Sequence, residues 1–276
     1  MGKKLLHTCI LFFTVLLLST FAFAYSQPLE NGILWLTSNQ NSDGSWGSNP
    51  DFAVLDTSTM LDTLKYLDVN NPAYSNGVIW LSSQSLLPND FLSRKMISLK
   101  IAGVDVSNDL LFLINKRNMD GGWSGDDDPT SMIFDTVLAL QALKAINYSD
   151  QTVIQSAINY LLSTQNPDGG WGFYPSTCSG CNDGDQSNVY MTALVSMTLQ
   201  QFQRTTSIAT AMNKATSYLI AHQNADGGFA TSIDSGQASS TIFETAYAYL
   251  ALVGETTDAT VLGNAINYLT SSQLPN

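Results

Sequence analysis

The sequence predicts an all-α protein made of about six helical-hairpin repeats, the last of them incomplete. An aromatic residue followed by leucine recurs near a helix end at positions 35, 80, 112, 160, 218 and 268, with 32 to 58 residues between copies. The flanks repeat as well, because AINYLLSTQ begins at Ala157 and AINYLTSSQ begins at Ala265. Such self-similarity indicates one supersecondary unit repeated along the chain. No segment shows the sustained two-residue alternation of a strand.

The first element resembles a leader rather than part of the fold. Lys3 and Lys4 precede an apolar run from Leu5 to Leu18, and Ala22-Phe23-Ala24 has the small-x-small pattern of a cleavage site. This predicts a signal peptide over 1–24, a single repeat domain over 25–276, and a secreted, periplasmic or cell-surface location. The alternative is a membrane anchor, but the run is short for a span of roughly 20 residues. We expect no integral span after cleavage.

Each repeat breaks at a similar turn. Four copies read Asp43-Gly44-Ser45-Trp46, Asp120-Gly121-Gly122-Trp123, Asp168-Gly169-Gly170-Trp171 and Asp226-Gly227-Gly228-Phe229. Asp and Gly tolerate the backbone of a helix stop and a tight turn. The second repeat along the chain lacks this turn and has Leu86-Leu87-Pro88-Asn89 in its place.

A second helix is expected after each turn. The apolar spacing places these inner helices at roughly 52–67, 89–102, 130–146, 187–202 and 237–253. They are apolar on more than one face, which predicts burial on most sides. About eleven helices follow the leader. The chain stops at Leu274-Pro275-Asn276, where a sixth turn would begin, so the expectation is either an open circle or a piece of a longer chain.

The charge balance excludes some partners. With 11 basic and 23 acidic residues the chain carries a net charge of −12. Such a surface repels nucleic acid and other polyanions, so we expect no nucleic-acid partner.

The Gln-led turns resemble a known family. Gln40…Asp43-Gly44-x-Trp46, Gln165…Asp168-Gly169-Gly170-Trp171 and Gln223…Asp226-Gly227-Gly228-Phe229 are similar to the Gln/Trp repeats of the squalene cyclase and protein prenyltransferase superfamily. The resemblance covers nearly the whole chain after the leader. It implies an α/α toroid, in which inner helices ring a cavity and the loops after the turns form one rim.

The resemblance implies less about activity. Triterpene cyclases of this superfamily protonate an alkene with Asp-x-Asp-Asp-Thr, whereas this chain has Met132-Ile133-Phe134-Asp135-Thr136, which matches only in the last Asp and the Thr. Asp126-Asp127-Asp128 comes too early to replace the motif. Prenyltransferases need a zinc site of Asp, Cys and His and a basic pocket, and basic residues are scarce here.

Three acids are candidate catalytic residues because they take equivalent places early in inner helices: Asp56, Asp135 and Glu244. Each is followed by Thr, and the fourth copy is Met191-Thr192, which has lost the acid. One interpretation is a carboxylate ring that binds a cation or polar ligand. The other is structural, with the acids bonding turn amides and the positive helix ends.

The rim offers candidate cation ligands at Asp126, Asp127, Asp128, Asp183 and Asp185. The loop from Gly172 to Asn188 holds the last two, and if it approaches its neighbour the carboxylates could share a cation such as calcium. Cys178 and Cys181 lie on the same loop, and a local disulfide is the expected state in an exported protein.

Four aromatic residues of the inner helices are candidate cavity residues: Phe134, Tyr190, Phe243 and Tyr247. They predict either core packing or a platform for an apolar ligand. The favoured hypothesis is an exported binding or scaffold module for an apolar or neutral small ligand, or for other extracytoplasmic domains. The alternative is a divergent terpenoid-cyclase-like or glycan-active enzyme that uses the cavity and rim carboxylates.

Overall fold

The computed structural model describes residues 27–69, 71–85, 87–125, 130–178, 184–230 and 239–272. These residues form eleven α-helices and no strand, which confirms the all-α prediction. The helices are α2 (Gln27–Ser38), α3 (Ala53–Tyr66), α4 (Pro72–Ser83), α5 (Asn89–Ile101), α6 (Ser107–Asn115), α7 (Ile133–Ala145), α8 (Gln151–Ser163), α9 (Val189–Leu199), α10 (Thr206–Ala221), α11 (Ile242–Leu252) and α12 (Ala259–Ser271). The predicted leader, Asp126, Asp127, Asp128, Cys181 and Asp183 lie outside the described residues.

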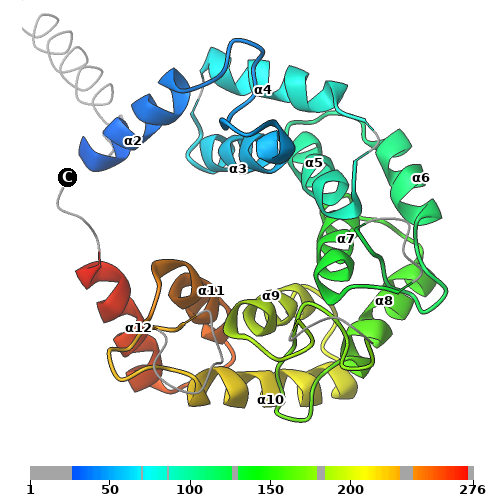
Figure 1. Cartoon of the computed structure of the whole chain (residues 1–276), viewed down its shortest axis with the longest axis vertical. Helices are drawn as coiled ribbons and strands as arrows, with labels where there is room; N and C mark the ends of the chain where they lie inside the picture. Colours follow the sequence, from blue (N-terminus) through cyan, green and yellow to red (C-terminus); the bar gives the residue numbers. More distant parts are fainter. Residues whose placement is uncertain are drawn as a thin grey trace, which may run out of the picture. The chain divides into compact units, whose positions relative to one another are not determined.

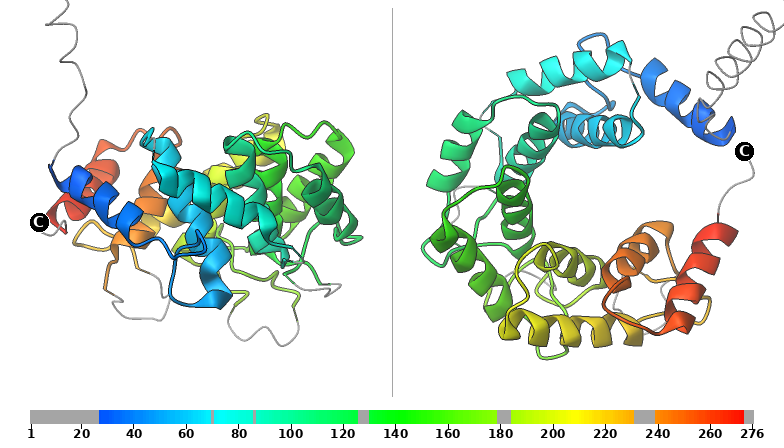
Figure 2. Two further views of the ribbon diagram at one scale, coloured as in Figure 1. Left: turned by 90° about the horizontal axis from the view of Figure 1, so that it is seen from above. Right: turned by 180° about the vertical axis from the view of Figure 1, so that it is seen from behind.

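The chain divides into two compact units. Residues 1–40, with 276, form the first, whose described part contains α2, and residues 41–275 form the second. Within the second unit α3, α5, α7, α9 and α11 make a curved inner row, and α4, α6, α8, α10 and α12 lie outside it (Figure 1). Each inner helix packs on the next one in the row. Figure 2 shows the same two rows from behind and edge-on.

The prediction that the inner helices are buried on most faces is confirmed for α7 and α9, whereas Ile242, Phe243 and Leu250 of α11 are more than half exposed. In α7 and α9 most side chains are buried, among them Val137, Leu140 and Val195. The outer helices are one-sided, and capping residues fix where they begin. Asp150 accepts the Thr152 N–H at the start of α8, and Asp258 accepts the Thr260 N–H at the start of α12. None of the described helices is long and apolar enough to cross a membrane.

The Asp-Gly turns share one hydrogen-bond network. In the third repeat, Asp168 Oδ1 accepts the Gly170 N–H at 2.9 Å and the Ser187 hydroxyl at 2.7 Å. Asp120 and Asp226 bind their own Gly N–H and Ser hydroxyl in the same way. The aspartate therefore closes the turn and ties it to the approach of the next inner helix.

Two of the turns also reach the outer helix of the following repeat through a glutamine side chain. Gln165 Nε2 donates to the Gly169 carbonyl at 2.8 Å and to the Ala211 carbonyl of α10 at 2.9 Å. Gln223 makes the same pair of bonds to Gly227 and to Val261 of α12. Gly169 has a φ of +93°, and a Cβ on it would lie 2.7 Å from the Lys214 carbonyl oxygen, so this position requires glycine.

The second repeat, which lacks the turn, is held differently. Lys95 of α5 is 5% exposed, and its Nζ donates to the Gln84 carbonyl at 2.7 Å and to Asp109 Oδ1 of α6 at 2.9 Å. Buried Asn89 donates to the Ser124 carbonyl. A charged side chain thus takes over the connection that the turn provides in the other repeats.

Candidate functional site

The threonine of each acid–threonine pair fastens the turn to the inner helix. The Thr136 hydroxyl accepts the Trp123 N–H at 3.0 Å, and Thr57, Thr192 and Thr245 accept the N–H of Trp46, Trp171 and Phe229 at 2.9 to 3.0 Å. The threonines therefore have a structural role in the turns, and the two interpretations of the acids both remain predictions. The role of the threonine is the same in the fourth copy, where Met191 stands in place of the acid and Thr192 accepts the Trp171 N–H.

The three candidate acids are placed separately. Asp135 is 2% exposed on α7, Glu244 is 6% exposed on α11, and Asp56 is half-buried on α3 beside Gly47. In the inner row α5 lies between α3 and α7, and α9 lies between α7 and α11. No two of the three acids are therefore on adjacent inner helices. Glu244 also belongs to a helix cap, because its side chain accepts the Thr241 hydroxyl while its N–H donates to Thr241 Oγ1.

The candidate aromatics do come together. Tyr190 is the centre of the group, with its ring centroid 5.2 Å from that of Phe243 and 5.0 Å from that of Tyr247. Phe173 joins Tyr190 to Phe134 at 6.3 and 6.0 Å. These five residues are called the aromatic face below. Phe134, Tyr190 and Phe243 lie in the first turns of α7, α9 and α11, Tyr247 lies in the second turn of α11, and Phe173 lies in the loop after Trp171.

The aromatic face is only partly covered. Phe173 is 37% exposed and Phe243 is 53% exposed, whereas Ala248 and Leu252 of the same α11 are fully buried. Sequence reasoning placed Phe173 on the rim loop and not in this group. The bond from the Ile133 N–H to the Phe173 carbonyl at 2.9 Å brings it against α7, and no local pattern signals such a contact.

One cation lies at the edge of the aromatic face. The guanidinium of Arg94, from α5, is 6.0 Å from the centroid of Phe134. Burial raises the pKa of Tyr190 to about 12; Tyr247 and Glu244 add to the rise, and the positive charge of Arg94 opposes it. The exposed rings of Phe173 and Phe243 make the face mainly apolar, and the charged groups of Arg94 and Glu244 both act on the Tyr190 phenol.

Of the five candidate rim acids, only Asp185 lies within the described residues. Asp185 lines a pocket of about 400 Å³ together with Asp168 and Ser187. Among the described residues no group of three or more His, Cys, Asp and Glu side chains is placed to hold a metal ion. Calcium binding and the Cys178–Cys181 disulfide remain predictions, since their other residues lie outside the described ranges.

The sequence profile of the prenyltransferase alpha-alpha toroid domain matches residues 4–276. The chain belongs to this toroid family. The match covers nearly the whole chain and confirms both the resemblance of the Gln/Trp repeats and the toroid fold. It also includes most of the segment assigned above to a signal peptide, and that assignment remains a prediction.

Several relatives of this toroid are terpenoid synthases. The chain is 40% identical over 80 residues to (+)-kolavenyl diphosphate synthase of Herpetosiphon aurantiacus, which covers 29% of the chain and 15% of the relative. It is 27% identical over 224 residues to drimenyl diphosphate synthase of Streptantibioticus cattleyicolor, covering 70% and 40%. The chain thus spans well under half the length of these relatives.

Solved structures confirm the fold. The ent-copalyl diphosphate synthase of Streptomyces platensis matches with a TM-score of 0.60 at 19% identity, over 81% of this chain and 45% of that one. An inactive variant of the α-1,6-mannanase GH76A of Salegentibacter matches with a TM-score of 0.58 at 13% identity, over 88% and 84%. The same fold therefore carries both terpenoid and glycan chemistry, and the site must decide between them.

The partly buried carboxyl of Asp62 gives the toroid a testable pH dependence. Burial raises the pKa of Asp62 on α3, against the lowering effects of the Ser98 hydroxyl and of Arg94. Because the folded state then binds this proton more tightly than the unfolded state, ionised Asp62 costs stability at neutral pH. That cost disappears as the pH falls through the folded pKa. We expect Asp62→Asn to raise the unfolding temperature at pH 7 and to change it little at about pH 3.5, below the usual pKa of Asp.

Differential scanning calorimetry at several pH values measures this effect. Asp105→Asn is the matched control, for which we expect a change in unfolding temperature of the opposite sign. Hydrogen bonds from Ser107 lower the pKa of this exposed carboxyl. Asp105→Asn should lower the unfolding temperature at pH 7, and the loss should shrink on acidification. A destabilised Asp62→Asn variant at pH 7 would contradict the assignment.

Proposed function

We propose that this chain is an exported toroid that binds an isoprenoid ligand on its aromatic face and does not transform it. The observation that carries the proposal is the aromatic face itself, in which Phe134, Phe173, Tyr190, Phe243 and Tyr247 remain in ring contact while Phe173 and Phe243 are more than a third exposed. Leaving such side chains in contact with water forgoes burial energy of about 1.5–3 kcal/mol each when burial would be complete. An uncovered apolar surface of this kind marks a binding site.

The ligand class follows from the chemistry of the face and from the relatives. Kolavenyl diphosphate, drimenyl diphosphate and lanosterol, the products named for three relatives, are built from isoprene units. A branched hydrocarbon chain suits a row of aromatic rings, because their faces and edges give contact without demanding hydrogen bonds. Arg94 at the edge of the face would take a polar head group.

The residues of the cyclase motif favour binding without catalysis, because one of its acids is missing at position 134. Protonating an alkene needs a carboxyl that is held protonated by burial and by a second carboxyl nearby. Phe134 stands where the cyclase motif of the superfamily has the corresponding acid, which leaves Asp135 alone in the motif. An apolar side chain thus stands at position 134, where the motif has an acid, and it belongs to the aromatic face.

A cyclase is the second candidate, favoured by one observation. Asp135 follows Phe134 of the aromatic face and is only 2% exposed, so it is the buried carboxyl nearest to the apolar platform in the sequence. A glycan-active enzyme using the rim carboxylates remains a prediction that rests on the fold alone.

Equilibrium binding of geranylgeraniol, followed by native mass spectrometry, tests the proposal. We expect the protein to bind it and Phe243→Ala to weaken the affinity roughly tenfold, because the truncation removes about 1–2 kcal/mol of contact. Phe112→Ala is the matched control, since Phe112 is 37% exposed on the outer helix α6. Equal binding by both variants, or none by the unaltered protein, refutes the proposal.

Gas chromatography of an incubation with squalene or geranylgeranyl diphosphate separates the two candidate functions. A cyclised product that is absent with Asp135→Asn would show that the protein is a cyclase and not only a binding protein.

A further inference from the structure

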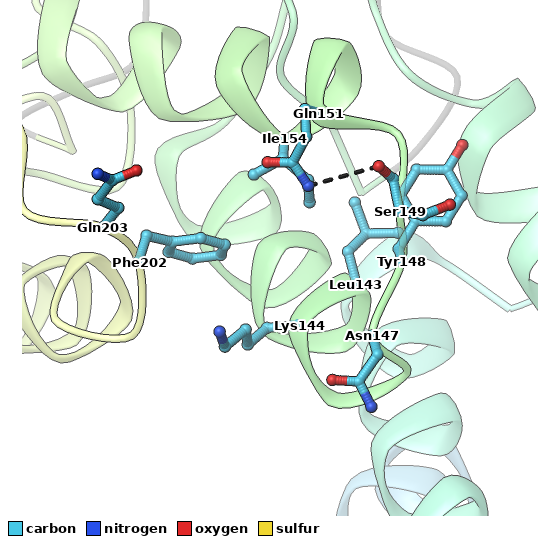
Figure 3. A pocket seen from close by; sticks show the side chains of 9 residues that line it. All are labelled: Leu143, Lys144, Asn147, Tyr148, Ser149, Gln151, Ile154, Phe202 and Gln203. Atoms are coloured by element: carbon cyan, nitrogen blue, oxygen red, sulfur yellow. Dashed lines mark hydrogen bonds between the residues drawn. The ribbon is translucent and has the colours of Figure 1, made fainter.

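A pocket of about 430 Å³ lies at the other end of the inner helices from the aromatic face (Figure 3). It opens where α7 ends, where the link to α8 begins and where the link after α9 passes. Leu143 and Ile154 line its apolar part, and Lys144, Asn147, Ser149, Gln151, Phe202 and Gln203 supply most of the remainder. Its size is within the range of small-molecule sites.

At the next junction of inner helices, between α9 and α11, an ion pair joins the two positions that correspond to Tyr148 and Phe202 of this pocket. Leu143, Leu199 and Leu252 are equivalent, fully buried leucines near the ends of α7, α9 and α11. Five residues after Leu199, Arg204 forms a bidentate pair with Glu255, which comes three residues after Leu252, at 2.6 and 2.9 Å.

At the junction of α7 and α9 the same two positions hold Tyr148 and Phe202. Both side chains line the pocket instead of bridging the links by a hydrogen bond pair. The pocket is therefore a local departure from the repeat, and the need to join neighbouring repeats does not explain it.

Asn147 lines the pocket from the position just after α7. It ends α7 with a φ of +56°, and the Tyr148 N–H returns to the Leu143 carbonyl at 2.9 Å. The helix α5 ends in the same way with Gly103, and α3 ends so with Asp68. Because glycine satisfies this backbone without strain, the fold does not require the amide of Asn147. That amide is available to a ligand.

The lining fits a neutral, hydroxylated molecule. Side-chain amides donate and accept hydrogen bonds, as a sugar hydroxyl also does, and the ring of Phe202 offers a flat apolar surface to the C–H face of a sugar. No acid lines the pocket, and Lys144 is its single charged group, with Nζ 5.5 Å from the Phe202 ring. The helix C-termini around it carry partial negative charge, which offsets that ammonium and disfavours an anion.

We propose that this pocket binds one neutral hexose ring, either as a free sugar or as the end of a glycan. The proposal is independent of the isoprenoid site, because the two sites lie at opposite ends of α7 and α9 and share no residue. It adds a second ligand class to a protein whose aromatic face is apolar.

Saturation-transfer NMR with methyl glucoside, methyl mannoside and methyl galactoside, and with the matching disaccharides, tests it on the full chain. At least one methyl hexoside should bind saturably. Asn147→Gly should weaken its affinity by about three- to tenfold, the effect of one lost hydrogen bond. Asp68→Gly makes the same backbone change at the end of α3, outside the pocket, and should leave binding unchanged. Tighter binding of a disaccharide identifies a glycan end, and equal binding identifies the free sugar.

Phe202→Ala adds a second variant, in which binding should fall further because the stacking surface is removed. The proposal is overturned if no hexoside binds at tens of millimolar. It is equally overturned if a hexoside binds and neither Asn147→Gly nor Phe202→Ala weakens it.

Discussion

Trp171→Ala should lower the free energy of unfolding by about 3–5 kcal/mol, the usual cost of truncating a fully buried aromatic side chain. Trp171 has no exposed surface, and its indole N–H donates to the Leu161 carbonyl at the end of α8 at 2.8 Å. Its backbone N–H is held by Thr192 of α9. The truncation therefore leaves a cavity and an unpaired carbonyl between an outer and an inner helix. Urea unfolding followed by circular dichroism measures the loss.

The chain supplies the matched control for this variant. Phe229 occupies the equivalent, fully buried position of the next repeat. Trp171→Phe should therefore keep most of the packing and cost about 1–2 kcal/mol, chiefly the lost indole hydrogen bond and some ring volume. Equal losses for the alanine and phenylalanine variants would show that the indole bond, and not the volume, holds the repeat.

Lys95→Ala should cost about 3 kcal/mol, the lower end of the range for breaking a buried ion pair. Its ammonium is the shared donor for Gln84 and Asp109, and removing it leaves the Asp109 carboxylate, whose side chain is 21% exposed, without this cation. The loss falls at the lower end because water can reach Asp109 in part. Thermal and urea unfolding provide the measurement.

Lys100→Ala is the control for Lys95, since Lys100 is exposed on the same helix. A surface change of this kind should stay within about 0.5 kcal/mol. If Lys95→Ala unfolds no more easily than Lys100→Ala, the second repeat is held by its apolar contacts, and the ion pair adds nothing.

Much of the fold could be predicted because its determinants are local. Apolar spacing and the Asp-Gly turns place an inner helix at 130–146, and the structure has α7 at Ile133–Ala145. The predicted 89–102 corresponds to α5 at Asn89–Ile101. Boundaries are least accurate before the first helical turn, where residues such as Ser131 and Met132 are extended in order to bond the preceding turn.

The candidate site was predictable only in part, because its contacts are long-range. The sequence identifies acid–threonine pairs, yet only the fold shows that Thr136 and Thr192 hold the turn amides. The aromatic residues of α7, α9 and α11 could be selected by position. Phe173 could not, because its place depends on a backbone bond to Ile133, forty residues before it in the chain. Lys95 likewise shows its role only when α6 lies beside α5.

The glutamine bridges that join the Asp168 and Asp226 turns to the next outer helix have a consequence for how the protein emerges during synthesis. Gln165 reaches a carbonyl 46 residues later in the chain, and Gln223 reaches one 38 residues later. A turn that has left the ribosome therefore waits several seconds, at about 5–20 residues per second, before its partner helix exists. Until then its aromatic residue and its open amides are exposed. Folding should advance from the N-terminal end with a lag of one repeat, and a translational pause just before α10 or α12 would prolong the vulnerable interval for the preceding turn.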